Sequence, residues 1–162
     1  MRLILLSLFI NFSIVITLTS SSFAESINFK GLLISDFWIN APIGNHKMTS
    51  GYLTIENTSN IDERLVSLTS EISKKTQLHN MVFKNDIMRM KNLTDGIVIK
   101  ANSKVSFKSR RFHVMFMKLH KSLTIMNKYK VTLKFENSGY VILNMPVHNK
   151  NSNNKTKKQH HH

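Results

Sequence analysis

The chain has 162 residues, of which 41% are hydrophobic and none is cysteine, and its formal net charge is +14. This length suffices for one domain with its own hydrophobic core. Without cysteine there can be no disulfide framework, thiol redox centre, CxxCH haem attachment, cysteine zinc finger or blue-copper electron-transfer site. The positive charge suits acidic partners, but the lysines are scattered and no basic run is interleaved with aromatic residues. We therefore predict no nucleic-acid binding.

The first 24 residues have the three parts of a secretory signal peptide. Arg2 supplies the positive charge, Leu3–Leu18 is an apolar run, and Ser22 and Ala24 are the small residues that precede a cleavage site. An uncleaved membrane anchor is the alternative, but the apolar run is short for a bilayer span. We expect cleavage after Ala24, a periplasmic location and no stable membrane insertion after cleavage.

The next part of the chain, residues 25–148, has the pattern of many short β-strands separated by turns. Apolar and polar residues alternate in segments rich in β-branched and aromatic residues, and no stretch has a sustained helical period. The expected strands lie in Ser26–Trp38, Gly51–Asn57, Leu65–Ser70, Gln77–Phe83, Ile87–Leu93, Ile97–Ile99, Val105–Phe107, Phe112–Leu119, Tyr129–Glu136 and Tyr140–Val147. This pattern predicts a single all-β domain, either a sandwich or a barrel.

Residues 149–162 are polar and rich in lysine, and they include no apolar residue. A segment of this composition cannot bury a core, so we expect it to be disordered. It ends in His160–His162, which are either a native metal-binding tail or the remnant of an expression tag. Consecutive imidazoles there can hold Cu(II) or Ni(II) weakly.

Methionines are concentrated in residues 79–117, which hold five of the nine methionines together with two of the eight histidines. They fall at i, i+2 spacing in three expected strands, as His79-Asn80-Met81, Met88-Arg89-Met90 and His113-Val114-Met115-Phe116-Met117. Alternate residues of a strand share a face, so neighbouring strands would bring these groups to one patch. Thioether sulfur is a soft, neutral ligand and imidazole is borderline, so the patch suits Cu(I) better than Zn(II), Ca(II) or Mg(II).

Core packing is the alternative explanation for each of these methionines. Methionine is a flexible core filler, and alternation is typical of any half-buried strand. Packing explains the histidines less well, because buried imidazole nitrogens need partners. An exported β-sandwich adhesion or scaffold module therefore stays open beside a copper-binding protein. No nucleophile motif, phosphate loop or acid–base pair is recognisable, so we expect no enzymatic activity.

The remaining histidines outside the tail lack a partner at ligand spacing. We expect His46, His120 and His148 to be surface residues. Met48 follows His46 by two residues and weakly repeats the His-x-Met pattern, but it lies in an expected loop.

The spacing of the histidines and methionines resembles that of the PCuAC family of periplasmic copper chaperones. The family pattern is a histidine, ten residues, a methionine, about twenty-one residues and then His-x-Met. Here ten residues separate His79 from Met90, twenty-two separate Met90 from His113, and Met115 completes the pattern. The similarity covers roughly Ile34–Val147.

The chain departs from the family in two places. One additional residue precedes His113, near an expected turn, so we expect the strand register to be kept. Asn40 stands where the family often has arginine.

The resemblance implies a cupredoxin-like Greek-key β-sandwich that binds one Cu(I) per domain at an exposed site. The implied ligands are His79, Met90, His113 and Met115. Met81, Met88 and Met117 fall outside this set and are expected to pack or to support the site. The family delivers copper towards the CuA centre of cytochrome c oxidase, so the implied partners are the CuA subunit or a thiol-bearing assembly factor. Copper sequestration without delivery is the alternative within the same chemistry.

Overall fold

The computed structural model describes residues 25–84 and 87–149, and every regular element in that part of the chain is a β-strand. The strands are β1 (Ser26–Phe29), β2 (Leu32–Asn40), β3 (Met48–Asn57), β4 (Glu63–Ser70), β5 (Ser73–Lys84), β6 (Ile87–Asn92), β7 (Ile97–Ile99), β8 (Ser103–Ser106), β9 (His113–Leu119), β10 (Lys128–Phe135) and β11 (Tyr140–His148). The predicted all-β class is confirmed. The expected signal peptide and nearly all of the expected tail lie outside the described residues.

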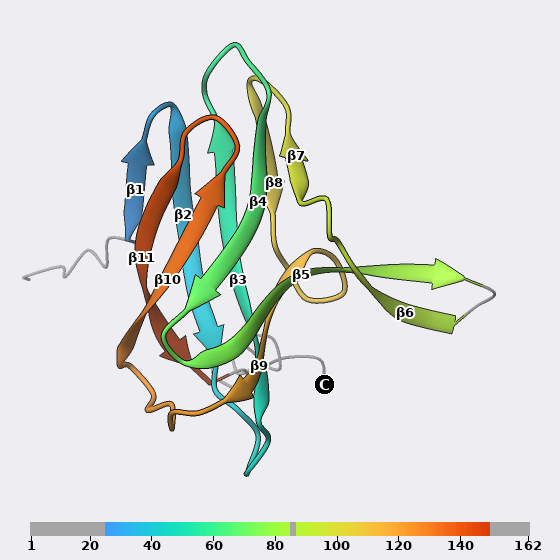
Figure 1. Ribbon diagram of the computed structural model, residues 1–162, viewed down its shortest axis with the longest axis vertical. Coiled ribbons are helices and arrows are strands. Elements are labelled where there is room, and N and C mark those ends of the chain that lie inside the picture. The colour runs from blue at the N-terminus through green and yellow to red at the C-terminus, as the bar shows by residue number, and fades with distance from the viewer. Residues whose placement is uncertain (1–24, 85–86, 150–162) are drawn as a thin grey trace, which may run out of the picture.

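The strands follow the order β6-β5-β9-β3-β2-β11-β10-β4-β7, with β1 added to β2 and β8 to β3. A short parallel pairing of β2 with β11 joins the two halves of this order, through Ile39 with Val147 and Asn40 with His148. The strands fold over at this junction, so that β4, β10 and β11 form one layer and β1, β2 and β3 form the other (Figure 1). The result is the sandwich that the alternating pattern predicts.

Alternate side chains of the strands fill the space between the two layers. In β11, for example, Val141, Leu143, Met145 and Val147 are buried while the residues between them are more exposed. Phe116 of β9 and Phe135 of β10 are the largest fully buried side chains. This alternation is expected of antiparallel strands that cover a core with one face. No helix in the described part of the chain is long and apolar enough to cross a membrane.

Strand β5 changes its partners along its length. It pairs with β9 from Ser73 to His79 and with β6 from His79 to Lys84. Past His79 the strand leaves the sandwich, and its hairpin with β6 projects from the body of the molecule (Figure 1). His79 is therefore the residue at which β5 is paired on both sides, and β6 is an edge strand.

A buried carboxylate fastens the turn between β10 and β11 to the start of β4. Glu63 accepts hydrogen bonds from the backbone N–H of Ser138 at 2.8 Å, from the Ser138 hydroxyl at 2.7 Å, and from the N–H groups of Arg64 and Asn137. Burial acts to raise the pKa of Glu63, but these donors together hold the pKa below its ordinary value. The charged form is thus the one that the fold stabilises.

Candidate metal centre

Strands β5 and β9 place two histidines directly opposite each other. His79 and His113 are register partners, and their ring centroids lie 5.8 Å apart with an interplanar angle of 72°. Directly opposed residues of an antiparallel pair point to the same side of the sheet. The two imidazoles therefore meet on the sheet face opposite the core, even though 33 residues separate them in the sequence.

Methionines flank this pair on both sides. Met90 of β6 is the register partner of Met81, which lies two residues beyond His79 and shares its face. Met115 lies two residues beyond His113 on the same face of β9. The four residues that the family pattern implies, His79, Met90, His113 and Met115, are thus on one face of three neighbouring strands.

The additional residue before His113 does not shift the register of β9. His113 pairs with His79, and Met115 pairs with Gln77 in the same ladder. A slip by one residue would have turned both β9 side chains towards the core. The length difference is therefore absorbed between β6 and β9, as the sequence predicts.

Hydrogen bonds define which ring nitrogens carry protons. Nδ1 of His113 lies 2.9 Å from the carbonyl oxygen of Arg111, and Nε2 of His79 lies 3.3 Å from Oε1 of Gln77. Both oxygens only accept, so these two nitrogens carry the protons and the lone pairs are on Nε2 of His113 and Nδ1 of His79. Nδ1 of His79 is buried and has no hydrogen-bond partner, a state that only Asn40 Oδ1 shares among the described side chains.

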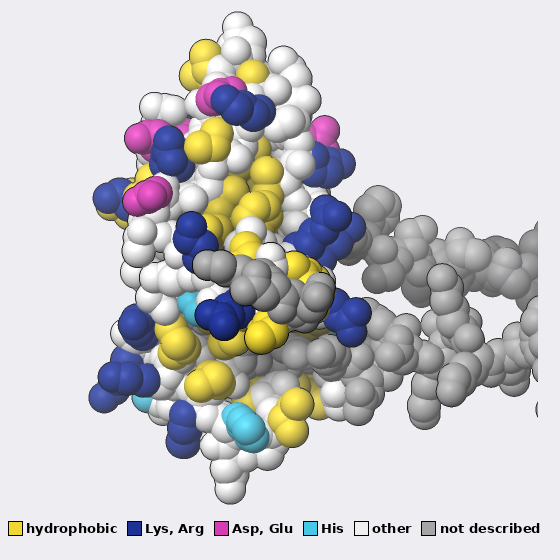
Figure 2. Space-filling view, turned by 90° about the vertical axis from the view of Figure 1, so that its right-hand side faces the viewer, with side chains coloured by type: hydrophobic (Ala, Val, Ile, Leu, Met, Phe, Trp, Pro, Cys, Tyr) yellow, Lys and Arg dark blue, Asp and Glu magenta, His cyan; other side chains and the backbone are white. Residues whose placement is uncertain are grey.

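The surroundings of His79 favour its neutral form, which is the form that binds a metal. Burial is the main factor that lowers the pKa of His79, and electrostatic repulsion from His113 and Lys75 lowers it further. No Asp or Glu occurs in β5, β6 or β9. Figure 2 looks onto the projecting hairpin, and Lys and Arg side chains lie around it. The Asp and Glu side chains that are visible in this view lie in the upper part of the molecule.

Burial differs among the four residues in a way that leaves one side of the patch open. His113 is buried, His79 and Met115 are partly buried, and Met90 is 57% exposed on the edge strand. Packing accounts well for Met145, which is fully buried in the core. It does not account for Met90, whose large apolar side chain remains mostly in solvent.

Three further methionines, Met48, Met88 and Met117, lie on the same face of the sheet as the four residues. Met88 opposes Phe83 near the hairpin tip, and Met117 opposes Met48 across β3 and β9. The sequence predicts a loop at Met48, but this residue begins β3. No group of three or more His, Cys, Asp or Glu side chains that could hold a metal occurs in the described residues. Thioethers are the soft donors that this face offers beside the two imidazoles.

Comparison with known proteins assigns the chain to a family. The chain belongs to the LpqE-like family, whose model, "Putative lipoprotein LpqE-like", matches residues 32–147. It is 29% identical to "Putative lipoprotein Lxx21020" of Leifsonia xyli subsp. xyli (strain CTCB07), over 72% of this chain and 69% of that protein. It is 26% identical to "Uncharacterized protein RP573" of Rickettsia prowazekii (strain Madrid E), over 64% of this chain and 58% of that protein. The lipoprotein names are compatible with export.

Solved structures share the fold. The "Copper-bound PCuAC domain from PmoF2" superposes with a TM-score of 0.66 at 20% identity, covering 77% of this chain and 98% of that chain. The "Solution structure of CuI-DR1885 from Deinococcus Radiodurans" superposes with a TM-score of 0.61 at 20% identity, covering 80% and 83%. The cupredoxin-like PCuAC fold that the sequence resemblance implies is thereby confirmed.

Proposed function

We propose that this protein is a copper chaperone that binds one Cu(I) through His79, Met90, His113 and Met115. The observation that carries the proposal is the opposed pair of His79 and His113, with an unpartnered Nδ1 on His79 and thioethers on either side of the pair. A buried lone pair without a donor is costly, and a bound cation would satisfy it.

The chemistry of the four donors selects Cu(I). Two imidazoles and two thioethers are neutral, so they would compensate a divalent ion poorly, whereas Cu(I) carries one charge and prefers soft donors. The Arg111 carbonyl and the Gln77 amide orient the two imidazoles, which is the usual supporting arrangement around metal-binding histidine.

The same features favour release to an acceptor. No anionic ligand holds the ion, and the charge of Lys75 is close enough to act on His79. An acceptor with anionic thiolates offers a softer and more negative ligand set. Met90 is exposed on an edge strand, so an acceptor can displace its sulfur first. The basic surroundings of the hairpin would attract an acidic surface on the acceptor (Figure 2).

The acceptor that we propose is the CuA subunit of cytochrome c oxidase or a thiol-bearing assembly factor that precedes it. This choice is supported by the PCuAC fold and by the signal-peptide pattern, which would place the protein in the periplasm. It also explains why the domain itself contains no cysteine, because a thiolate would retain the ion that the protein has to give up.

A Cu(I) titration under reducing conditions against a chromophoric chelator tests the binding step. The parent should hold one tight equivalent, and His79→Gln should lose it while keeping the urea midpoint of the parent. Absence of tight Cu(I) binding would favour the scaffold alternative. The loaded protein is then mixed with a reduced CuA domain and the copper content of each is measured after separation. Retention of copper by this protein would indicate sequestration and contradict delivery.

A further inference from the structure

A hollow lies next to the candidate metal centre on the same face of the sheet. It has a volume of about 200 Å³, and its lining includes Asn40, His46, Met48 and Met115. Met115 belongs both to the lining of this hollow and to the candidate metal centre, because it lies two residues from His113 on β9. The hollow and the candidate metal centre are therefore adjacent along one strand.

Strand register brings two further thioethers to this position. Met48 and Met117 are direct partners across β3 and β9, and Met117 lies two residues beyond Met115 on the same face. Side chains so opposed have Cβ atoms roughly 4.5–5.5 Å apart, within reach for two flexible methionines to share one ion. Met48 is 52% exposed, so core packing does not explain it.

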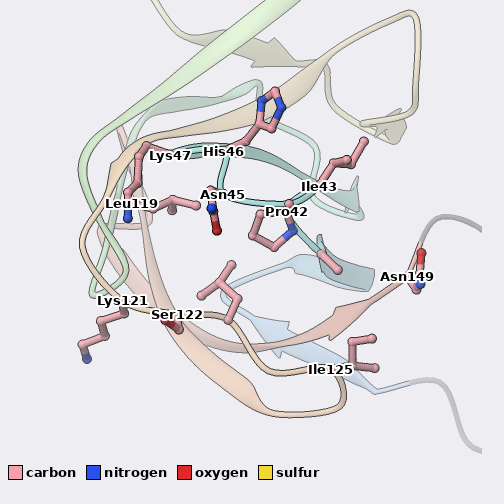
Figure 3. Close-up of a pocket in the computed structure, with 13 residues that line it drawn as sticks. Pro42, Ile43, Asn45, His46, Lys47, Leu119, Lys121, Ser122, Ile125 and Asn149 are labelled. Atoms are coloured by element: carbon pink, nitrogen blue, oxygen red, sulfur yellow. The ribbon is translucent and has the colours of Figure 1, made fainter.

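An imidazole and an unpartnered oxygen complete the surroundings. The loop after β2 lines both this hollow and a larger cavity of about 510 Å³, and Pro42 and His46 contribute to both linings. The His46 ring points away from Pro42 and Leu119 in that cavity (Figure 3). Oδ1 of Asn40, which lines the smaller hollow, is buried without a hydrogen-bond partner. It could accept the second N–H of a metal-bound imidazole, as carbonyl oxygens commonly do.

We propose that His46, Met48, Met117 and the shared Met115 form a second, weaker position for Cu(I). The metal's identity rests on the function proposed above. This position has one imidazole instead of two, and Lys75 is the register partner of Met117, so its affinity should be lower. Copper can move between the positions by ligand exchange, in which a bond to the Met48 or Met117 sulfur forms as a bond to a histidine nitrogen breaks. The oxidation state does not change.

The test uses the full chain with His160→Gln, His161→Gln and His162→Gln, which removes the imidazoles of the tail. Cu(I) is added under reducing conditions, first against a strong chelator and then a weak one. We expect a tight equivalent and a second bound at least tenfold more weakly. With methyl-labelled methionine, the Met90 signal should move with the first equivalent, and those of Met48 and Met117 with the second.

The deciding variant is Met48→Leu/Met117→Leu in this background, with Met126→Leu as the matched control. Leucine keeps volume and apolarity while removing sulfur, so folding should be preserved. The double variant should lose the second equivalent of Cu(I), and its dissociation constant for the first equivalent should stay within threefold of the parent value. Saturation of the parent at one equivalent, or a second equivalent unchanged in the double variant, would overturn the inference. The His79→Gln variant tests the first site independently. If the proposed function is wrong, this variant still binds the tight equivalent of Cu(I), whatever the double variant does.

Discussion

Replacing Met90 with leucine separates a ligand from a packing residue. The Met90 side chain is 57% exposed on the edge strand β6, and leucine has nearly the same volume. The substitution should therefore change the free energy of unfolding by less than about 0.5 kcal/mol. Any larger effect of Met90→Leu on copper binding then has to come from the lost sulfur.

The expected loss of Cu(I) affinity follows from the neighbours of Met90. Loss even of supporting groups around a metal costs about 10–100-fold in affinity, and a direct ligand should cost at least as much. Met81 is the register partner of Met90 and can partly replace its sulfur. We expect a loss of about 10–100-fold, or about 1.4–2.8 kcal/mol, in Met90→Leu. The Met81→Leu/Met90→Leu variant should lose more.

Competition with a chromophoric Cu(I) chelator measures both constants, and urea unfolding of the apo proteins measures stability. Met126→Leu is the control, because Met126 is 70% exposed in the loop between β9 and β10. Parent-like affinity in Met90→Leu would show that Met90 is not a ligand and would refute the proposed set of four.

Three further predictions concern the fold and the protonation of the site. Glu63→Gln should lower the free energy of unfolding by about 2–3 kcal/mol, since a charged acceptor is lost from a buried network. Because folding lowers the pKa of Glu63, the stability that its carboxylate contributes is present above the ordinary value of 4.5 and is lost as the pH falls through the pKa of the folded state. Urea unfolding midpoints of the parent and of Glu63→Gln at neutral and acid pH measure the effect of the substitution and its pH dependence. A parent-like midpoint of Glu63→Gln at neutral pH would contradict the proposed role of the carboxylate. The affinity for Cu(I) should be constant down to a pH of about 6.5 and should fall only below it, because free histidine titrates near that value and the pKa of His79 is lowered. An affinity that stays constant into strong acid would exclude the proposed set of two histidines and two methionines. Tight Zn(II) binding by protein without the tail histidines would exclude it as well. In Gly51→Ala the new Cβ would lie 2.7 Å from Cε2 of Phe116, so the free energy of unfolding should fall by about 1–3 kcal/mol. Cu(I) binding should also weaken, because Phe116 lies in the same strand as His113 and Met115. A parent-like thermal unfolding midpoint would show that the Phe116 ring can move aside without cost.

Local sequence patterns predicted the strands of this fold well, because each strand covers the core with one face. The limits of β7 agree with Ile97–Ile99, and those of β11 differ from Tyr140–Val147 by one residue. The predicted start of β3 at Gly51 was wrong, because turn residues such as Pro42 and Gly44 led us to extend the preceding loop too far. Pairing with β9, which no local pattern records, begins β3 at Met48.

The candidate site divides in the same way between local and non-local information. The i, i+2 spacing predicted that His113 and Met115 share a face, and the resemblance predicted the ligand set. The opposition of His79 and His113 depends on a pairing between strands distant in sequence. The free nitrogen of His79 depends on Gln77, whose i, i+2 relation to His79 was a visible signal that the interpretation did not use.

The position of the site in the fold explains how one set of residues could both hold and release an ion. His79 is the residue at which β5 is paired on both sides, with His113 on one strand and Asn92 on the other. Backbone paired on two sides is held more firmly than an edge strand, which fixes the place of the His79 imidazole, while the Arg111 carbonyl orients the His113 ring. Met90 lies on a hairpin that is paired on one side only, so its sulfur can leave at smaller cost. Fixed nitrogens with a displaceable sulfur give an arrangement in which an acceptor can enter the coordination shell without unfolding the donor.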